Sequence, residues 1–290
     1  MQGPAISNAK NYIRDQLRRA SDRFIARTVR VALGWKEKRK RSAFVAKINR
    51  KDTIPTVNLE NLGYSSVACD PQLTSEFIKL CQQRLEETKE FKQRGGKDFF
   101  SQLLKPEDYE LDSPIMRFAL DEKLLNTTAL YIGTAPYLQS IELLYSRPVT
   151  GPAKSSQLWH RDRHDKDVLK VFVYCHDVGP KNGPFTFIPK SFGKNVPERL
   201  YHYISDETMR KYVDDAAIQV LEGPAGSTLL IDTYSCYHKG SYCIEPRLAA
   251  ILYFDSGFGY RKRFGTWSIP PEKLKTLSPL QRYALGDVPE

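Results

Sequence analysis

A change of pattern after Pro136 constrains the fold more than any other feature of the chain. From there on, short apolar runs alternate with segments rich in Gly, Pro and Asn, which is typical of strands joined by turns. Asn182 and Gly183 form the dipeptide of a tight hairpin between two of these runs. The second half of the chain is therefore predicted to be a β-sandwich or barrel. The runs occupy residues 138–145, 168–175, 185–188, 227–231 and 248–254.

The first half of the chain has the apolar spacing of helices. Residues 8–33 contain neither Pro nor Gly and carry apolar side chains at steps of three and four. A second helix is predicted from about residue 71, with Asp70 or Thr74 as its cap, and a third over 113–126. The expected order is a helical part at about 60–130, a β core at about 131–256 and a C-terminal tail at 257–290, which includes a short helix.

The basic charge of the chain is concentrated at its N-terminus. The net charge is +10 at pH 7, yet residues 1–51 hold 15 Lys and Arg against three acidic residues, which leaves residues 52–290 at −2. We therefore divide the chain into a basic, helical extension (1–51) and one domain (52–290). Because the domain is nearly neutral, a nucleic-acid partner is not expected.

Three roles remain open for the basic extension. The helix has two apolar stripes on different faces, one of them through Ile25, Val29 and Leu33, and two stripes fit docking against the domain. The many Arg fit contact with a membrane surface, and the composition fits a mitochondrial targeting peptide. The other stripe comprises Ile13, Leu17, Ala20, Phe24, Thr28 and Val31. The run 36–41 (KEKRKR) is interpreted as a solvated linker.

The cysteines and the hydropathy exclude several classes of protein. The chain has five cysteines and no C-x-x-C, so neither a disulfide scaffold nor a Cys-rich zinc module is expected. It contains no apolar stretch of about 18 residues and does not open on a secretory signal. We expect a cytoplasmic protein that is at most peripheral to a membrane.

A His-x-Asp motif is the best candidate for chemistry. His160 and Asp162 stand two residues apart, so on an extended backbone both side chains point the same way. His238 follows a later strand and could reach the same point in a barrel. Two His and one carboxylate on one face of a metal leave its opposite positions open, as in non-haem Fe(II) oxygenases. His164 is a weaker alternative to His160 because it lacks the two-residue spacing to a carboxylate.

Arg247 stands at the start of the most apolar run, 248–254. A guanidinium aimed into a barrel could bind a dicarboxylate through two parallel hydrogen bonds. The alternative is an Arg at the mouth of the strand, paired with Glu245 or with solvent.

These segments resemble the phytanoyl-CoA dioxygenase family of Fe(II)/2-oxoglutarate-dependent oxygenases. The resemblance covers roughly residues 113–256, through QLWHRDRHD (157–165), VFVYCHDVGPKNGPFTFIPKSF (171–192), PAGSTLLIDTYSCYHKG (224–240) and EPRLAAILYF (245–254). It implies a double-stranded β-helix, or jelly-roll, core with flanking helices. Two departures are Lys190-Ser191-Phe192, where relatives often have Gly-Ser-His, and an Asp232-to-His238 spacing that is one residue longer than in many members.

The resemblance also implies a site and a reaction. His160, Asp162 and His238 would hold Fe(II), and Arg247 would bind the far carboxylate of 2-oxoglutarate. Because relatives that halogenate replace the carboxylate ligand with a small residue, Asp162 favours hydroxylation of a small or lipid-like substrate by O2, with release of succinate and CO2.

The roles of several nearby side chains are less defined. Tyr145 and Gln157 are expected to contact the oxo acid. Trp159, beside the first ligand, is interpreted either as a substrate wall or as a core aromatic.

Two other functions remain possible for this pattern. One is a catalytically inactive, oxygenase-like protein that binds membrane or nucleic acid through residues 1–51. The other is a zinc hydrolase that uses the same two His and Asp.

Overall fold

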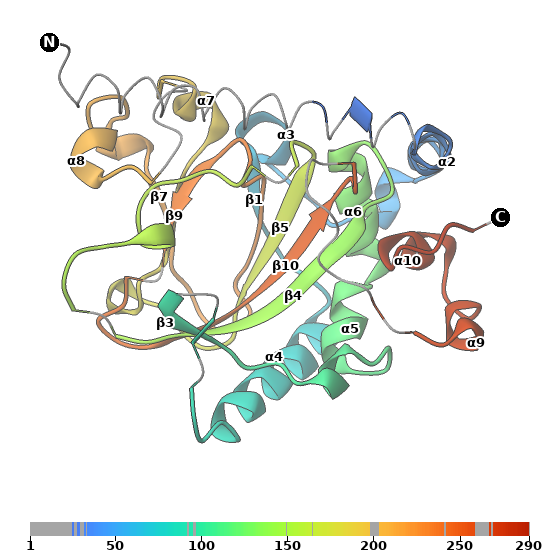
Figure 1. The fold of residues 1–290 in the computed structure, drawn as a ribbon, viewed down its shortest axis with the longest axis horizontal. Coiled ribbons are helices and arrows are strands. Elements are labelled where there is room, and N and C mark those ends of the chain that lie inside the picture. Colours follow the sequence, from blue (N-terminus) through green and yellow to red (C-terminus); the bar gives the residue numbers. More distant parts are fainter. Residues whose placement is uncertain are drawn as a thin grey trace, which may run out of the picture.

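The computed structural model describes residues 25, 28–29, 32, 34–91, 93–94, 97–148, 150–163, 165–197, 203–240, 242–258, 267 and 269–289. Figure 1 shows a strand-rich centre with helices along its edges. The helices are α2 (Trp35–Val45), α3 (Leu59–Leu62), α4 (Pro71–Glu86), α5 (Pro114–Ala119), α6 (Glu122–Ile132), α7 (Lys190–Gly193), α8 (Asp206–Met209), α9 (Pro271–Leu274) and α10 (Pro279–Ala284). The strands are β1 (Tyr64–Val67), β2 (Gln93–Arg94), β3 (Lys97–Gln102), β4 (Tyr137–Ser146), β5 (Val168–Tyr174), β6 (Phe185–Ile188), β7 (Gln219–Leu221), β8 (Thr228–Ile231), β9 (Tyr237–Lys239) and β10 (Arg247–Asp255).

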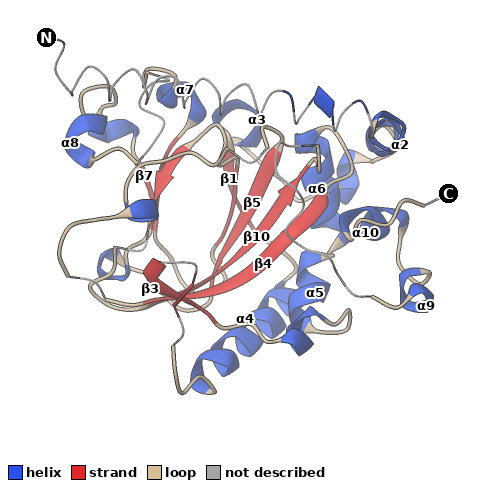
Figure 2. Ribbon diagram, viewed as in Figure 1, coloured by secondary structure: helices blue, strands red, loops and turns tan. Residues whose placement is uncertain are grey.

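The strands form two antiparallel sheets. The major sheet has the order β1-β8-β5-β10-β4-β3-β2, and the minor sheet has the order β7-β6-β9. In Figure 2 the helices α4, α5, α6 and α10 lie on one side of the major sheet, while the minor sheet lies on the other side. This mainly β jelly-roll with flanking helices confirms the fold class predicted from the sequence.

Strand β5 illustrates how the sequence builds both layers of the core. Its odd-numbered side chains, Leu169, Val171 and Val173, belong to the large cluster between the major sheet and the helices. On the opposite face, Phe172 packs with Phe185 of the minor sheet inside the barrel. Because both faces are buried, the strand is apolar almost throughout, and alternation is visible only where Lys170 interrupts it.

The helices predicted from about residue 71 and over 113–126 are present, with one correction. Helix α4 begins where expected, and the Asp70 side chain caps it by accepting a hydrogen bond from the Leu73 backbone at 2.9 Å. The single helix predicted over 113–126 is wrong. The structure has two helices, α5 and α6, and Asp121 between them accepts a hydrogen bond from the Leu124 backbone and so starts the second one.

The hairpin predicted at Asn182-Gly183 is also wrong. A 3-10 helix, Pro180–Asn182, ends at Gly183, whose φ is 61°. The strands on either side, β5 and β6, belong to different sheets. The dipeptide therefore carries the chain across from the major to the minor sheet, and its left-handed glycine serves a crossover rather than a hairpin.

The basic run 36–41 is part of the fold rather than a solvated linker. It lies within α2, and Arg41 is fully buried. The Arg41 guanidinium donates to the backbone carbonyls of Ala135 and Tyr283 and stacks on the ring of Tyr137, 3.5 Å away. A single arginine thus ties α2 to the entry of β4 and to α10.

Most of the predicted helix 8–33 lies outside the described residues. Residues 25, 28, 29 and 32 are helical, and the side chains of Ile25 and Val29 are 54% and 48% exposed. These two side chains are therefore not buried against the domain, as the docking interpretation expected. Among the residues that the structure describes, none belongs to a helix long and apolar enough to span a bilayer.

Candidate metal centre

The structure brings the three predicted ligands together at one end of the barrel. A nitrogen or oxygen atom from each of His160, Asp162 and His238 lies within 4.8 Å of the others. Two reciprocal backbone hydrogen bonds, of 3.0 and 2.9 Å, join His160 to His238 in β9. A third, from the Asp162 amide to the Thr233 carbonyl, spans 2.8 Å. The backbone alone therefore holds the ligand-bearing segments in register.

Both imidazoles are fixed in the tautomer that a metal requires. The Nδ1 atom of His160 lies 2.9 Å from the Leu158 carbonyl oxygen, and Nδ1 of His238 lies 3.1 Å from that of Cys236. Because a carbonyl only accepts, each Nδ1 carries a proton, and Nε2 is the ring nitrogen that could ligate a metal. Burial above all, with the neighbouring His160, lowers the pKa of His238 to about 3, so this ring is neutral at physiological pH.

The carboxylate is held in its ionised form. Burial by itself would raise the pKa of Asp162, but the charge of Lys170, assisted by the two imidazoles, outweighs burial and holds that pKa well below its usual value. The Lys170 ammonium lies 2.7 Å from Oδ2 of Asp162, and the same oxygen lies 3.7 Å from Nε2 of His238. Two imidazoles and one carboxylate form a nitrogen–oxygen donor set that fits Fe(II).

Arg247 lies near this centre on the inner face of the barrel. It begins β10, is 7% exposed and donates a hydrogen bond to the Gly183 carbonyl. Its guanidinium lies beside Gly240, where an added Cβ would be 3.6 Å from Nη1. Since Gly240 follows His238 by two residues, the predicted arginine and the predicted distal ligand share one corner of the barrel.

The other predicted contacts differ in their placement. Gln157 is buried, its Oε1 accepts from the Lys154 backbone, and it borders a surface pocket with Gly183 and Gly240. Tyr145 instead stacks on Phe91, at a ring distance of 4.5 Å, in the cluster on the helix side of the major sheet. This placement does not favour its expected contact with an oxo acid. His164 lies outside the described residues.

Trp159 is a core aromatic. It is 1% exposed and packs with Ile188, Val196 and Ile204. Its indole nitrogen donates to Asp206 at 2.7 Å. Because Trp159 also lines the pocket beside Asp206, the alternative that it forms a substrate wall stays a prediction.

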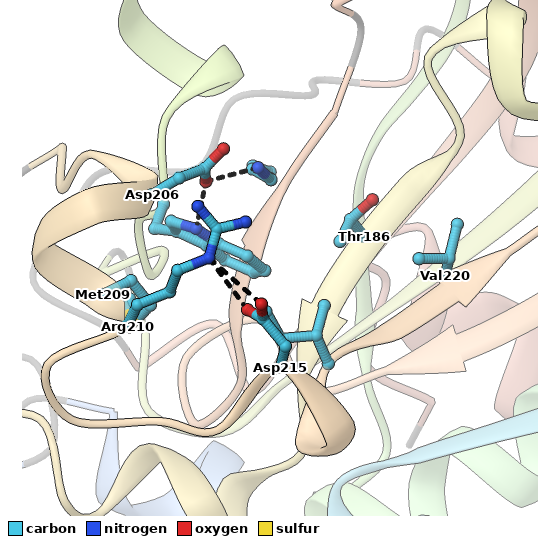
Figure 3. Close-up of a pocket in the computed structure, with 9 residues that line it drawn as sticks. Thr186, Asp206, Met209, Arg210, Asp215 and Val220 are labelled. Carbon is cyan, nitrogen blue, oxygen red and sulfur yellow. Dashed lines mark hydrogen bonds and ion pairs between the residues drawn. The ribbon is translucent and has the colours of Figure 1, made fainter.

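Sequence reasoning missed Asp206 and Lys170. Asp206, at the start of α8, accepts hydrogen bonds from the indole of Trp159 and from the ammonium of Lys239. Figure 3 shows both contacts as dashed lines in a pocket on the outer side of the minor sheet. No local signal marks Asp206, whereas Lys170 could have been noticed as the single charge in the apolar run 168–175.

A jelly-roll barrel that gathers two His and one carboxylate at its end defines the 2-His-1-carboxylate class of non-haem metal proteins. Residues 12–241 match the family described as phytanoyl-CoA dioxygenase (PhyH), and the chain belongs to this family. The match begins far upstream of residue 113 and includes most of the basic extension. The comparison with curated proteins returned no match.

Two solved structures of EctD share the fold at low identity, and a third structure is similar to a lower degree. EctD from S. alaskensis with 2-oxoglutarate and 5-hydroxyectoine is 19% identical, with a TM-score of 0.52 over 73% of this chain and 79% of that one. EctD with bound Fe is 18% identical, with a TM-score of 0.51 and the same coverage. The epimerase SnoN from nogalamycin biosynthesis is 16% identical, with a TM-score of 0.49 over 68% of this chain and 80% of that one.

Proposed function

We propose that this protein is an Fe(II)- and 2-oxoglutarate-dependent oxygenase. The observation that carries the proposal is the convergence of two imidazoles, each with its Nδ1 facing a backbone carbonyl, and one ionised carboxylate. Family membership supports the same conclusion. EctD, whose fold the chain shares, has been solved with Fe and with 2-oxoglutarate.

Each predicted site residue has a role in this proposal except Tyr145, whose ring is on the helix side of the sheet. His160, Asp162 and His238 would hold Fe(II). Arg247 would bind the distal carboxylate of 2-oxoglutarate, because it is the buried cation beside Gly240. Gln157 borders the same corner and would contact the oxo acid.

The reaction that we propose is hydroxylation of a small or lipid-like organic substrate. Bound Fe(II) would couple the conversion of 2-oxoglutarate and O2 into succinate and CO2 to oxidation of a substrate C–H bond. The protein would orient the reactants and exclude water. Phe172, Phe185 and Phe187, which pack together inside the barrel, provide an apolar wall beneath the ligands. Asp162 supplies the carboxylate that halogenating relatives replace with a small residue, which favours hydroxylation.

The test is succinate release by the full chain purified without oxygen. Release should require both Fe(II) and 2-oxoglutarate, and His160→Ala, Asp162→Ala and His238→Ala should each reduce Fe(II) binding and turnover to background. Asp215→Ala is a suitable control because Asp215 is exposed and pairs with Arg210, away from the ligands. Full Fe(II) affinity in the three ligand variants would overturn the assignment, and tightly bound zinc with 2-oxoglutarate-independent hydrolysis would favour the zinc alternative.

We also propose that the N-terminal region contacts an anionic membrane surface. Ile25, Val29 and Trp35 are 54%, 48% and 51% exposed, and the next exposed side chains along α2 include Lys36, Arg39 and Lys40. Three exposed apolar side chains, one of them a tryptophan, bordered by cations, match the chemistry of a charged lipid interface. The charge of +12 on residues 1–51 complements anionic lipids rather than neutral ones.

Cosedimentation with vesicles tests this contact. The protein should bind phosphatidylserine-containing vesicles and leave pure phosphatidylcholine vesicles unbound, with binding lost at high salt. The triple change of Ile25, Val29 and Trp35 to Ser should weaken binding and leave succinate release intact. Equal binding by this variant, or a preference for nucleic acid over anionic vesicles, would overturn the proposal. Vesicle binding without any turnover would favour the inactive, oxygenase-like alternative.

A further inference from the structure

Lys170 is a cation built into the inner face of the barrel. Its backbone is paired on both sides, with Ile231 of β8 and with Tyr253 of β10. The side chain lies on the same face of β5 as Phe172, and its ammonium lies 5.2 Å from the centre of the Tyr253 ring. Because both neighbouring strands fix the Cα of Lys170, the ammonium is held inside the barrel, where it contacts Asp162.

The ammonium contacts the carboxylate oxygen of Asp162 that faces His238. Lys170 Nζ lies 2.7 Å from Oδ2 of Asp162, and this oxygen also faces Nε2 of His238 at 3.7 Å. The side chains of Lys170 and Asp162 are only 18% and 17% exposed, so water screens the pair weakly.

A divalent ion bound by the triad would meet this ammonium on the same carboxylate. Two cations on one carboxylate repel each other, and poor solvation strengthens that repulsion. The carboxylate would either divide its two oxygens between them or release the ammonium. In both cases, metal binding weakens the existing ion pair between Lys170 and Asp162, and this loss offsets part of the attraction between Asp162 and the metal.

We propose that Lys170 is a positioning residue and internal counter-ion of Asp162, which keeps the carboxylate oriented and lowers the affinity of the triad for its metal. The inference rests on the proposed function in one respect, namely that the triad binds a metal. It adds a residue that sets how tightly the ion is held, and it treats Lys170 as acting through Asp162 rather than on a substrate.

The experiment compares Co(II) binding to the full chain in three forms: wild type, Lys170→Met and Lys170→Arg. Methionine keeps the apolar stem without the charge, and arginine keeps the charge. We expect Lys170→Met to bind Co(II) at least about 10-fold more tightly than wild type, and Lys170→Arg to stay within about 3-fold of wild type. The visible absorption of bound Co(II) should be the same in all three, because the three ligands are unchanged. Lys211→Met, at a side chain 64% exposed, controls for the loss of a lysine elsewhere.

Thermal unfolding gives a second readout that is independent of turnover. Without added metal, Lys170→Met should melt below wild type, because the buried carboxylate has lost its counter-ion. With saturating Co(II), the increase in Tm should be larger for this variant than for wild type. Unchanged or weaker Co(II) binding by Lys170→Met would overturn the inference while leaving the proposed function intact. Failure of wild type itself to bind Co(II) or Fe(II) would overturn both.

Discussion

Asp206 supports the two ligand histidines from the opposite side of the minor sheet. It accepts hydrogen bonds from Trp159, which precedes His160, and from Lys239, which follows His238. Neighbouring residues on extended backbone point to opposite faces, so fixing Trp159 and Lys239 outside fixes the two imidazoles inside. One carboxylate thereby joins the two segments at the point where their backbones already pair.

We therefore predict that Asp206→Ala weakens Co(II) binding by about 10-fold, whereas Asp206→Asn, which keeps an acceptor for the indole, weakens it less. Metal titration of the purified full chain measures the effect. Asp215→Ala is the matched control, because Asp215 lies in the same pocket but pairs only with Arg210 among the contacts described for it. Equal metal affinity in Asp206→Ala and wild type would show that the backbone pairing suffices.

Asp255 makes the stability of the protein depend on pH. The carboxyl is 7% exposed at the end of β10, and burial, together with the nearby Asp165, raises its pKa from 3.8 to about 7. Between these pH values the folded chain holds a proton that the unfolded chain has released. Stability from this group is therefore fully present below about pH 4 and declines as the pH rises to about 7, by up to roughly 4 kcal/mol at about 1.4 kcal/mol per pKa unit.

Urea unfolding at several pH values between about 5 and about 8 tests this decline. In Asp255→Asn the free energy of unfolding should change less with pH over this range, because the group that binds the proton is gone. Asp112→Asn, at a side chain 93% exposed, should keep the wild-type slope. An unchanged slope in Asp255→Asn would assign the pH dependence to other groups.

At the scale of elements, α2 depends on one buried cation. Arg41 donates to the carbonyls of Ala135 and Tyr283 and pairs with Glu37 at 3.0 Å, and its own side chain is fully buried. Arg41→Ala would remove the guanidinium donor from both carbonyls and the cation that pairs with Glu37. We predict a loss of about 3 kcal/mol in the free energy of unfolding, measured by urea titration. Lys40→Ala, at an exposed neighbour in the same helix, should change stability by less than about 0.5 kcal/mol.

The sequence predicted those elements whose formation depends on residues close together in the chain. Apolar runs identified β4, β5, β6, β8 and β10, and a cap identified α4, because burial and capping depend on residues a few positions apart. The crossover at Gly183 and the break before α6 were mispredicted. In both cases the backbone path depends on which distant segment the following residues pack against. A single sequence does not show these long-range contacts.

The site residues also differ in whether the sequence could predict them. His160 and Asp162 could be paired from their two-residue spacing, and His238 and Arg247 from their order along the family-like segments. Asp206 could not be found this way, since it is 47 residues from Trp159 and belongs to a short helix with no ligand of its own. Contacts made across the minor sheet come from topology and have no local signature.

For the molecule as a whole, the boundary of the fold lies further upstream than the charge pattern suggested. The charge divides the chain after residue 51, but α2 is already part of the domain, and Ile54 and Leu59 join the main cluster directly after it. The family match, which begins at residue 12, also crosses that boundary. Net charge indicates whether the surface of a segment faces solvent or a charged partner, but it does not show where the hydrophobic core of a domain begins.

Two truncations separate the basic region from the fold. Removing residues 1–33 deletes Ile25 and Val29 but keeps α2, which begins at Trp35, so anionic-vesicle binding should decrease while metal binding is retained. Removing residues 1–51 also deletes Arg41. The free energy of unfolding should then decrease by no less than in Arg41→Ala, for which we expect a loss of about 3 kcal/mol. Urea unfolding and Co(II) titration of both truncations measure the difference. If the shorter chain, 52–290, were as stable as 34–290, α2 would be an appendage despite its buried arginine, and the division of the chain by charge would be the correct one.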